Sequence, residues 1–591
     1  MKKIVLLLWI LSAWTSLHAI DIMRLSEIKP DMTGEGKTIF KGSKIETFQF
    51  KVLGILENFA PSKNLIFVEM ESPQLAESGV IQGMSGSPLY INNKVIGAVA
   101  YSFSFSKKPI AGVTPIEDII QVAGYNASGP RVEISDIKID FTQENMRDIS
   151  RRLREELSAR LNYAPQSTLV PIKLIGSSRG FKPEALSLLA PVFTSAQDLT
   201  MPGEITRQKF APDQFTVSPA DAVSVPLVRG DYEYSVSGTV THVDGKNIYL
   251  FGHPFYNLGR VDFPLHKAEI LTVIPSLDTS FKLAVTRQMV GAVVQDRFSG
   301  VLAEMGKTPN MIPLKMFLKN RNRSINLELV NHPLLTPVLT YISLLNVFQS
   351  EFQQYGFQTL AVNGKIFIEG EENIVLEDLF AGATAFDDFA NLLTAVNYFL
   401  ITNKERPVKI QKIDFNIETS ESVKRAELEN VLLSKTAYAP GELIDVHLSF
   451  KTEQGSSFEE KTQIKAPNLK PGSSFYLLVA DAAEIIEFDS KMIKTDYFPT
   501  RLSALIRAIN NLRKNNRVYF KLFVPTDGLY VQGFEYSHLP TSLSNVLTFN
   551  AAPRDQSPLS FSTISEYQYE VPAMVDGKKL FKIDIKERKN E

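Results

Sequence analysis

One stretch of the sequence decides how the rest is interpreted: GVIQGMSGSPLYINNKVIGAVAYS, residues 79–102. It places Ser85 in a corner between Gly83-Met84 and Gly86, and a run of apolar residues follows at once. Because glycine accepts backbone angles that other residues resist, this corner is expected to be a tight turn between strands. Such a turn can also direct backbone N–H groups and a hydroxyl toward one point, as a serine nucleophile requires.

The segments around this turn have the pattern of short β-strands. Asn92-Asn93 separates two apolar runs, and Asp244-Gly245 does the same further along the chain. Both pairs are typical of two-residue β-hairpin turns. Short strands separated by Gly, Pro and Asn favour small barrels or sandwiches over a parallel sheet.

The chain has 591 residues, which is too long for a single core, so several domains are expected. Apolar residues at helical spacing predict helices at 142–161, 385–401 and 500–513. The sequence predicts six segments: a signal peptide (1–19), a β lobe carrying Ser85 (20–125), a helix-containing connector (126–220), a second β lobe (221–345), a mixed α/β segment (346–405) and a β-rich, sandwich-like C-terminal domain (406–591).

The N-terminus has the three parts of a secretory signal. Lys2-Lys3 precede the apolar run Ile4–Leu11, and Leu17-His18-Ala19 is an acceptable cleavage site. The apolar run is too short for a comfortable membrane span. We therefore expect an exported protein, periplasmic or extracellular, with no stable transmembrane segment after signal removal.

The composition narrows the possible chemistry. The 63 Lys and Arg nearly balance the 65 Asp and Glu, which gives no support for nucleic acid as a partner. With no cysteine, disulfides, thiolate nucleophiles and iron–sulfur clusters are excluded. GEGKT (34–38) is not a phosphate loop because Asp31 stands where its first glycine belongs, and no H-E-x-x-H zinc motif occurs. No cofactor or metal is expected.

A serine nucleophile needs a base, and the sequence offers seven histidines. His253 lies in YLFGHPFYNLG (249–259), between Gly252 and Pro254 at the end of an apolar strand. His242 lies within a strand just before a hairpin turn, where a surface or cross-strand role is expected. Taken singly, the serine turn and His253 each have an ordinary structural explanation, as a strand corner and a buried histidine. In the catalytic interpretation, the N–H groups of Gly83 and Ser85 stabilise the oxyanion.

Four blocks of the sequence together resemble the SpoIVB-type serine peptidases, named after the stage IV sporulation protein B. The block around GMSGSP is the most specific, followed by the block around His253. The resemblance implies a chymotrypsin-like pair of β-barrels with Ser85 as nucleophile and His253 as general base. The lobes are in permuted order, because the serine block precedes the histidine block here. The four blocks are residues 26–42, 78–117, 237–264 and 290–306.

The acid that would orient His253 is left open by the sequence. The family places an acidic residue shortly before the serine, whereas Ser72 stands near that position here, with Glu71 beside it. Asp262 and Asp296 are the favoured candidates, because an acid in the histidine's own lobe most easily holds its imidazole.

The predicted function is that of an exported serine endopeptidase that cleaves specific protein partners through an acyl-enzyme. The alternative is an inactive protease fold that serves as a binding or scaffold module of the cell envelope, with contacts made by the C-terminal domain. A carbohydrate-binding role rests only on the predicted sandwich. It is disfavoured because both tryptophans, Trp9 and Trp14, lie in the predicted signal.

Overall fold

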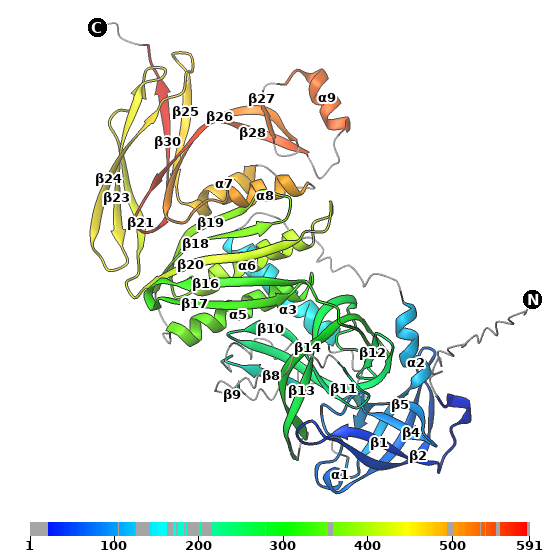
Figure 1. The fold of residues 1–591 in the computed structure, drawn as a ribbon. Helices are drawn as coiled ribbons and strands as arrows, with labels where there is room; N and C mark the ends of the chain where they lie inside the picture. Colours follow the sequence, from blue (N-terminus) through cyan, green and yellow to red (C-terminus); the bar gives the residue numbers. More distant parts are fainter. Residues whose placement is uncertain are drawn as a thin grey trace, which may run out of the picture.

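The structure is a computed structural model in which the chain passes through two β-barrels, a sheet covered by helices, and a C-terminal sandwich (Figure 1). The predicted signal peptide, 1–19, and much of the predicted connector, 126–220, lie outside the described residues. The described residues are 22–103, 106–125, 142–161, 169–172, 175–182, 185, 200–201, 216–277, 279–352, 358–492, 501–531, 534–537, 539–550 and 556–587.

The first barrel closes because β4 pairs with both β1 and β5. Its strands pair antiparallel in the order β4-β1-β2-β3-β6-β5. The predicted hairpin turn at Asn92-Asn93 is confirmed, with φ values of 49° and 62°. The strands are β1 (Thr33–Ile39), β2 (Ile45–Ala60), β3 (Lys63–Glu71), β4 (Pro88–Ile91), β5 (Lys94–Phe103) and β6 (Ile110–Pro115), with α1 (Pro73–Ser78) and α2 (Ile116–Ile120) beside them.

The second barrel closes in the same way, since β10 pairs with both β11 and β13. The strand order is β10-β13-β14-β15-β12-β11, all antiparallel, and Asp244-Gly245 forms the predicted hairpin turn. The mainly β fold class predicted from the sequence, with a chymotrypsin-like pair of barrels, is thus confirmed. The strands are β10 (Ala222–Gly230), β11 (Glu233–Asp244), β12 (Asn247–Leu250), β13 (Gly259–Ile274), β14 (Phe281–Arg297) and β15 (Gly300–Met305).

The connector contributes strands to both barrels as well as a helix. β7 (Leu169–Pro171) pairs antiparallel with β5 of the first barrel, and β8 (Ile175–Arg179) pairs antiparallel with β11 of the second. β9 (Thr200–Met201) lies beside β8. The described strands of the connector thus pair with both barrels.

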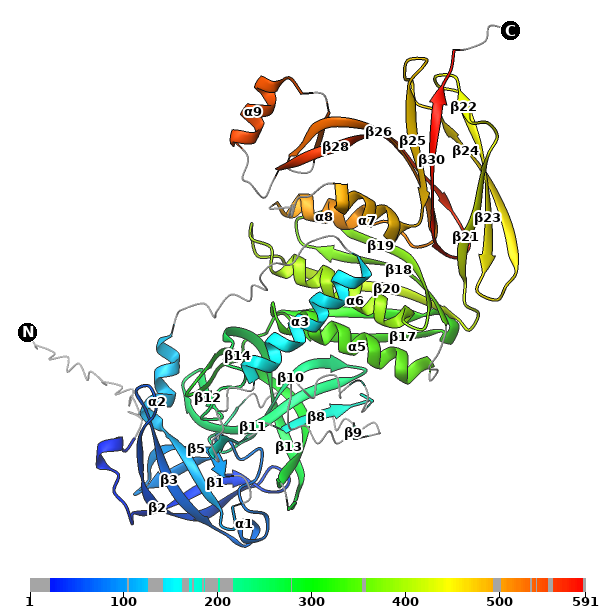
Figure 2. The same ribbon diagram turned by 180° about the vertical axis from the view of Figure 1, so that it is seen from behind.

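A five-stranded sheet continues from the second barrel through the pairing of β17 with β10. Helices α5 and α6 cover one face of this sheet, and α3 packs against these two helices (Figure 2). α3 and α6 occupy the segments predicted to be helical at 142–161 and 385–401. The elements are β16 (Met311–Leu318), β17 (Arg323–Val330), β18 (Gln358–Ile368), β19 (Ile374–Gly382), β20 (Ile410–Ser420), α3 (Gln143–Leu161), α5 (Leu335–Phe352) and α6 (Ala385–Ile401).

The domain boundary predicted at residue 345 falls inside α5. β16 and β17 belong with the later strands, because β16 pairs parallel with β20 about a hundred residues further on. Parallel neighbours need a long crossover, and the local sequence pattern carries no signal of such a pairing.

The C-terminal domain is a sandwich of two sheets whose inner faces share one apolar core. The predicted helix at 500–513 corresponds to α8, whose apolar side chains pack in the core of the preceding sheet, near β19 and α6. Among the described residues, no helix has the length and apolar character needed to cross a membrane. The elements are β21 (Arg425–Leu433), β22 (Ala437–Tyr438), β23 (Leu443–Thr452), β24 (Ser457–Lys465), β25 (Ser474–Ala480), β26 (Arg517–Val531), β27 (Phe534–Ser537), β28 (Gln556–Glu570), β29 (Met574–Asp576), β30 (Lys578–Ile585), α7 (Ala482–Met492), α8 (Leu502–Asn510) and α9 (Thr541–Asn550).

The first prediction concerns the close contact of the two barrels at Gly86. Gly86 has φ +93°, and a Cβ there would lie 2.0 Å from the carbonyl oxygen of Thr239 in β11. We expect Gly86→Ala to lower the free energy of unfolding by more than about 3 kcal/mol, from the clash and the strained backbone together. Urea denaturation of the full chain measures this.

Gly245→Ala is the matched control, because Gly245 also has positive φ but a Cβ there would meet nothing within 4 Å. It should lower the free energy of unfolding by only about 1–2 kcal/mol. Equal effects of the two substitutions would contradict the close barrel contact.

Candidate active site

Residues 81–87, called the serine turn below, form a tightly hydrogen-bonded corner between α1 and β4. The N–H of Met84 donates to the Ile81 carbonyl at 3.1 Å, and the N–H of Ser87 donates to the Met84 carbonyl at 2.8 Å. Gly83 and Gly86 have φ values of +87° and +93°, which explains why glycine stands on either side of Met84-Ser85. Every residue from 81 to 89 is buried.

The turn leaves alternate polar groups without a partner. The Gly86 N–H donates to the Val99 carbonyl at 2.8 Å. By contrast, the N–H groups of Gly83 and Ser85 donate to no acceptor among the described residues, and neither does the buried Ser85 hydroxyl. Buried polar groups without partners are rare and call for an explanation. Here, the two free N–H groups are those that the sequence analysis assigned to the oxyanion hole.

Two threonines of β11 hold the serine turn against the second barrel. Thr239 donates from its N–H to the Ser85 carbonyl at 2.9 Å and from its hydroxyl to the Gly83 carbonyl at 2.8 Å. Thr241 donates from its hydroxyl to the Gly86 carbonyl at 2.9 Å. The sequence analysis did not single out these threonines. Their only sequence signal is their alternate spacing in SGTVTHV, which places both side chains on one face of a strand.

His253 follows β12 at the same contact between the barrels. The adjacent Gly252 packs against β5, where a Cβ would lie 3.0 Å from that of Ala98, and its carbonyl accepts a 2.5 Å hydrogen bond from the Thr114 hydroxyl. The His253 side chain is buried, and its Nδ1 lies 2.8 Å from the Pro254 carbonyl. A carbonyl only accepts, so Nδ1 carries the proton and Nε2 keeps its lone pair.

Burial lowers the pKa of His253 to about 4, although the carbonyls of Pro254 and Ile172 act in the opposite direction. The imidazole is therefore neutral near pH 7. Its Nε2 is buried and has no hydrogen-bond partner among the described residues. A neutral imidazole with a free Nε2 is the form that a general base requires.

Ser85 and His253 lie at the same barrel contact, but no hydrogen bond joins them. A Cβ added at Gly238 would lie 3.2 Å from the Ser85 hydroxyl oxygen and 2.5 Å from the Phe251 ring. Both side chains therefore lie on the same side of Gly238. The Phe251 ring in turn stacks on the His253 ring, with 6.4 Å between ring centroids. Ser85 and His253 thus lie on either side of the Phe251 ring, and no hydrogen bond joins them.

Two residues of the connector, Ile172 and Ile175, lie near His253 and Gly238. Ile172, which follows β7, is buried and donates its N–H to the Ala100 carbonyl at 2.8 Å. Its own carbonyl lies close enough to His253 to affect the imidazole pKa. Ile175, at the start of β8, pairs with Ser237, the residue before Gly238. Ile172 therefore lies on the His253 side of the contact, and Ile175 pairs with the residue before Gly238.

Asp296 is fully buried and shapes the loop that follows His253. Its carboxylate accepts the backbone N–H groups of Phe255 and Tyr256, both at 2.7 Å, and that of Leu258 at 3.0 Å. Burial raises the pKa of Asp296 to about 6, against the effect of these three N–H groups. Asp296 makes no contact with the imidazole itself, so any orienting effect on His253 acts through the loop and the Pro254 carbonyl.

The other two candidate acids bond elsewhere. Asp262 accepts the N–H of Asn310 at 2.8 Å and lies 3.5 Å from the Lys307 amine. Glu71 is exposed at the end of β3. The identity of the orienting acid stays a prediction. Among the described residues, no three His, Asp or Glu side chains gather in an arrangement that could hold a metal ion.

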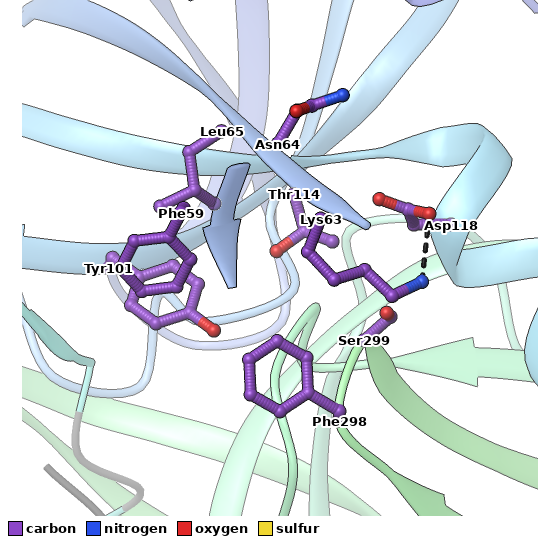
Figure 3. A pocket seen from close by; sticks show the side chains of 9 residues that line it. All are labelled: Phe59, Lys63, Asn64, Leu65, Tyr101, Thr114, Asp118, Phe298 and Ser299. Carbon is purple, nitrogen blue, oxygen red and sulfur yellow. Dashed lines mark hydrogen bonds and ion pairs between the residues drawn. The ribbon is translucent and has the colours of Figure 1, made fainter. Parts of the chain in front are cut away.

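A small pocket lies beside the His253 loop (Figure 3). Phe59 and Tyr101 of the first barrel form one wall, and Phe298, from the turn between β14 and β15, lies across from them. Lys63 and Asp118 form an ion pair at 2.9 Å in its lining. Thr114 also lines the pocket and bonds to Gly252, so the pocket adjoins the residue before His253.

Residues 14–116 match the family model of the SpoIVB peptidase S55. The match includes Ser85 and most of the first barrel, and it ends before His253 and the second barrel. The resemblance to SpoIVB-type serine peptidases is thus confirmed for this part of the chain. Searches of curated proteins and of solved structures found no match.

The second prediction follows from the lowered pKa of His253. An unfolded chain binds a proton at this histidine as the pH falls through 6.5, whereas the folded protein binds one only near pH 4. The free energy of unfolding should therefore fall by about 3 kcal/mol between pH 7 and pH 4 on account of this residue. Urea denaturation of the wild-type chain and of His253→Gln at both pH values measures the difference.

His253→Gln should lose that part of the pH dependence and keep the part due to Asp296 and the other titrating groups. An unchanged pH dependence in His253→Gln would show that the imidazole titrates at its ordinary value and is not buried in this way.

Proposed function

We propose that this protein is an exported serine endopeptidase that cleaves specific protein partners through an acyl-enzyme, with Ser85 as nucleophile and His253 as general base. The observation that carries the proposal is the pattern of unsatisfied groups at the barrel contact. The Ser85 hydroxyl, the His253 Nε2, and the N–H groups of Gly83 and Ser85 all lack partners among the described residues. These are the groups that acyl transfer uses.

In the proposed reaction, Ser85 Oγ attacks the carbonyl carbon of a peptide bond while its proton passes to His253 Nε2. The negative charge that develops on the carbonyl oxygen accepts hydrogen bonds from the N–H groups of Gly83 and Ser85. The carbon–nitrogen bond then breaks, and the imidazolium gives its proton to the leaving amine. Water then attacks the serine ester while His253 accepts its proton, and the imidazolium returns this proton to Ser85 Oγ as the ester bond breaks.

A substrate reaches these groups only after the buried contact opens. β7 and β8 occupy backbone edges of β5 and β11, one on each barrel. If the connector leaves, these edges become free to pair with another extended chain. An extended peptide adds to such edges through main-chain hydrogen bonds, which supports a protein as the substrate.

A second candidate function is favoured by the closed contact itself. No hydrogen bond joins Ser85 and His253, and both are buried. A contact packed in this way also suits an inactive protease fold that serves as a binding or scaffold module of the cell envelope. The two functions differ in whether Ser85 reacts.

The third prediction tests the reactivity of Ser85 with a fluorophosphonate probe on the full chain. We expect the wild type to be labelled slowly, because Ser85 is buried. Val170→Pro should be labelled faster, since proline removes a backbone donor opposite Ser102 and weakens the pairing of β7 with β5. Ser85→Ala should abolish labelling in both backgrounds, as measured by mass spectrometry of the intact protein.

Ser343→Ala is the matched control, because Ser343 is likewise fully buried with an unpartnered hydroxyl but lies in α5. It should be labelled like the wild type. Failure of both the wild type and Val170→Pro to be labelled, or equal labelling after Ser85→Ala, would contradict the peptidase and favour the scaffold.

A further inference from the structure

Lys282 lies beside the serine turn although it belongs to the second barrel. It is in β14, and its N–H donates to the Gln82 carbonyl at 3.1 Å. The Gln82 N–H donates in return to the Ser280 carbonyl at 2.8 Å. These two bonds fix the main chain of Lys282 against the residue that precedes the Gly83–Ser85 segment.

The Lys282 side chain connects to the serine turn through two hydroxyls. Its amine donates to the Thr38 hydroxyl of β1 at 2.7 Å, and the Ser87 hydroxyl donates to the same oxygen at 2.9 Å. Ser87 closes the turn around Ser85 through its bond to the Met84 carbonyl. Lys282, Thr38 and Ser87 have at most 1% of their surface exposed. The three side chains form a buried chain of hydrogen bonds between the second barrel and the serine turn.

The amine of Lys282 has no counter-charge. No carboxylate forms an ion pair with it in the described part of the chain, and burial alone lowers its pKa to about 7. Leaving an amine in such a site destabilises the fold relative to an apolar side chain of similar length. The stability of the barrels therefore gives no reason for a lysine at this position, whereas ionisable groups of this kind are common at functional sites.

We propose that Lys282 is a positioning residue for Ser85. By holding Thr38 and Ser87, its amine keeps the serine turn in the shape that directs the Ser85 hydroxyl and the N–H groups of Gly83 and Ser85 toward one point. It acts through these two hydroxyls and does not touch the substrate. The inference rests on the proposed peptidase function and adds a residue from the second barrel to the site.

The fourth prediction tests this role with Lys282→Met, which keeps the length of the side chain and removes the amine. We expect the maximal rate of fluorophosphonate labelling at Ser85 to fall by up to about 100-fold, because small misplacements of reacting groups have effects of this size. The probe concentration at half-maximal rate should change little. The thermal unfolding midpoint should stay the same or rise, since an uncompensated buried amine is lost.

Three further variants sharpen the test. Thr38→Val should slow labelling in the same way, and combining it with Lys282→Met should slow labelling no further, because the two residues act in one chain of hydrogen bonds. Lys315→Met, in β16 outside the serine-turn contact, is the control and should leave labelling unchanged.

A readout that does not depend on activity separates this inference from the proposed function. Hydrogen exchange of the main-chain N–H groups of residues 82–87 should become several-fold faster in Lys282→Met. Faster exchange in a protein that is never labelled would support the positioning role and contradict the peptidase. Unchanged labelling and exchange, or slower labelling together with a large fall in the unfolding midpoint, would overturn the positioning role.

Discussion

The rest of the N-terminal half depends on the close approach of the serine turn to β11. At Gly86 the two barrels come so near that a single Cβ would meet the Thr239 carbonyl at 2.0 Å. At this distance main-chain groups of one barrel bond directly to the other, as the Thr239 N–H does to the Ser85 carbonyl. The contact is therefore held by main-chain hydrogen bonds between the barrels, and it fixes the turn that carries Ser85.

This contact gathers ionisable groups that a simple core would avoid. His253, Lys282 and Asp296 are each fully enclosed, and burial moves the pKa of each toward its neutral form. In place of water, the His253 imidazole bonds to a carbonyl and the Lys282 amine to a hydroxyl. The Asp296 carboxylate accepts three main-chain N–H groups. Such groups reduce the stability of a fold unless they have another role. Lys282 lies beside the serine turn, and Asp296 holds the loop that follows His253. This grouping is the physical basis for regarding the contact as a site.

Several elements could be predicted because their signals are local. The hairpin at Asp244-Gly245 follows from a glycine that accepts φ +58°, and the apolar spacing of α3 and α6 follows from helix geometry. Asp296 was recognised as a residue of interest in the histidine's lobe, yet its partners are the N–H groups of Phe255, Tyr256 and Leu258 and not the imidazole. The sequence shows which residue types are present, and it does not show which donor a carboxylate will face.

The sequence by itself determined the mainly β character, the glycine-bounded serine turn and the family resemblance of the first barrel, since each depends on neighbours along the chain. Only the tertiary structure decided that Thr239 and Lys282 meet this turn and that Ile172 lies near His253, because strands far apart in the sequence must first close two barrels and bring them into contact. The tertiary structure also decided that Ser85 and His253 are both buried. Burial and partner choice are long-range properties, for which a local pattern carries no signal.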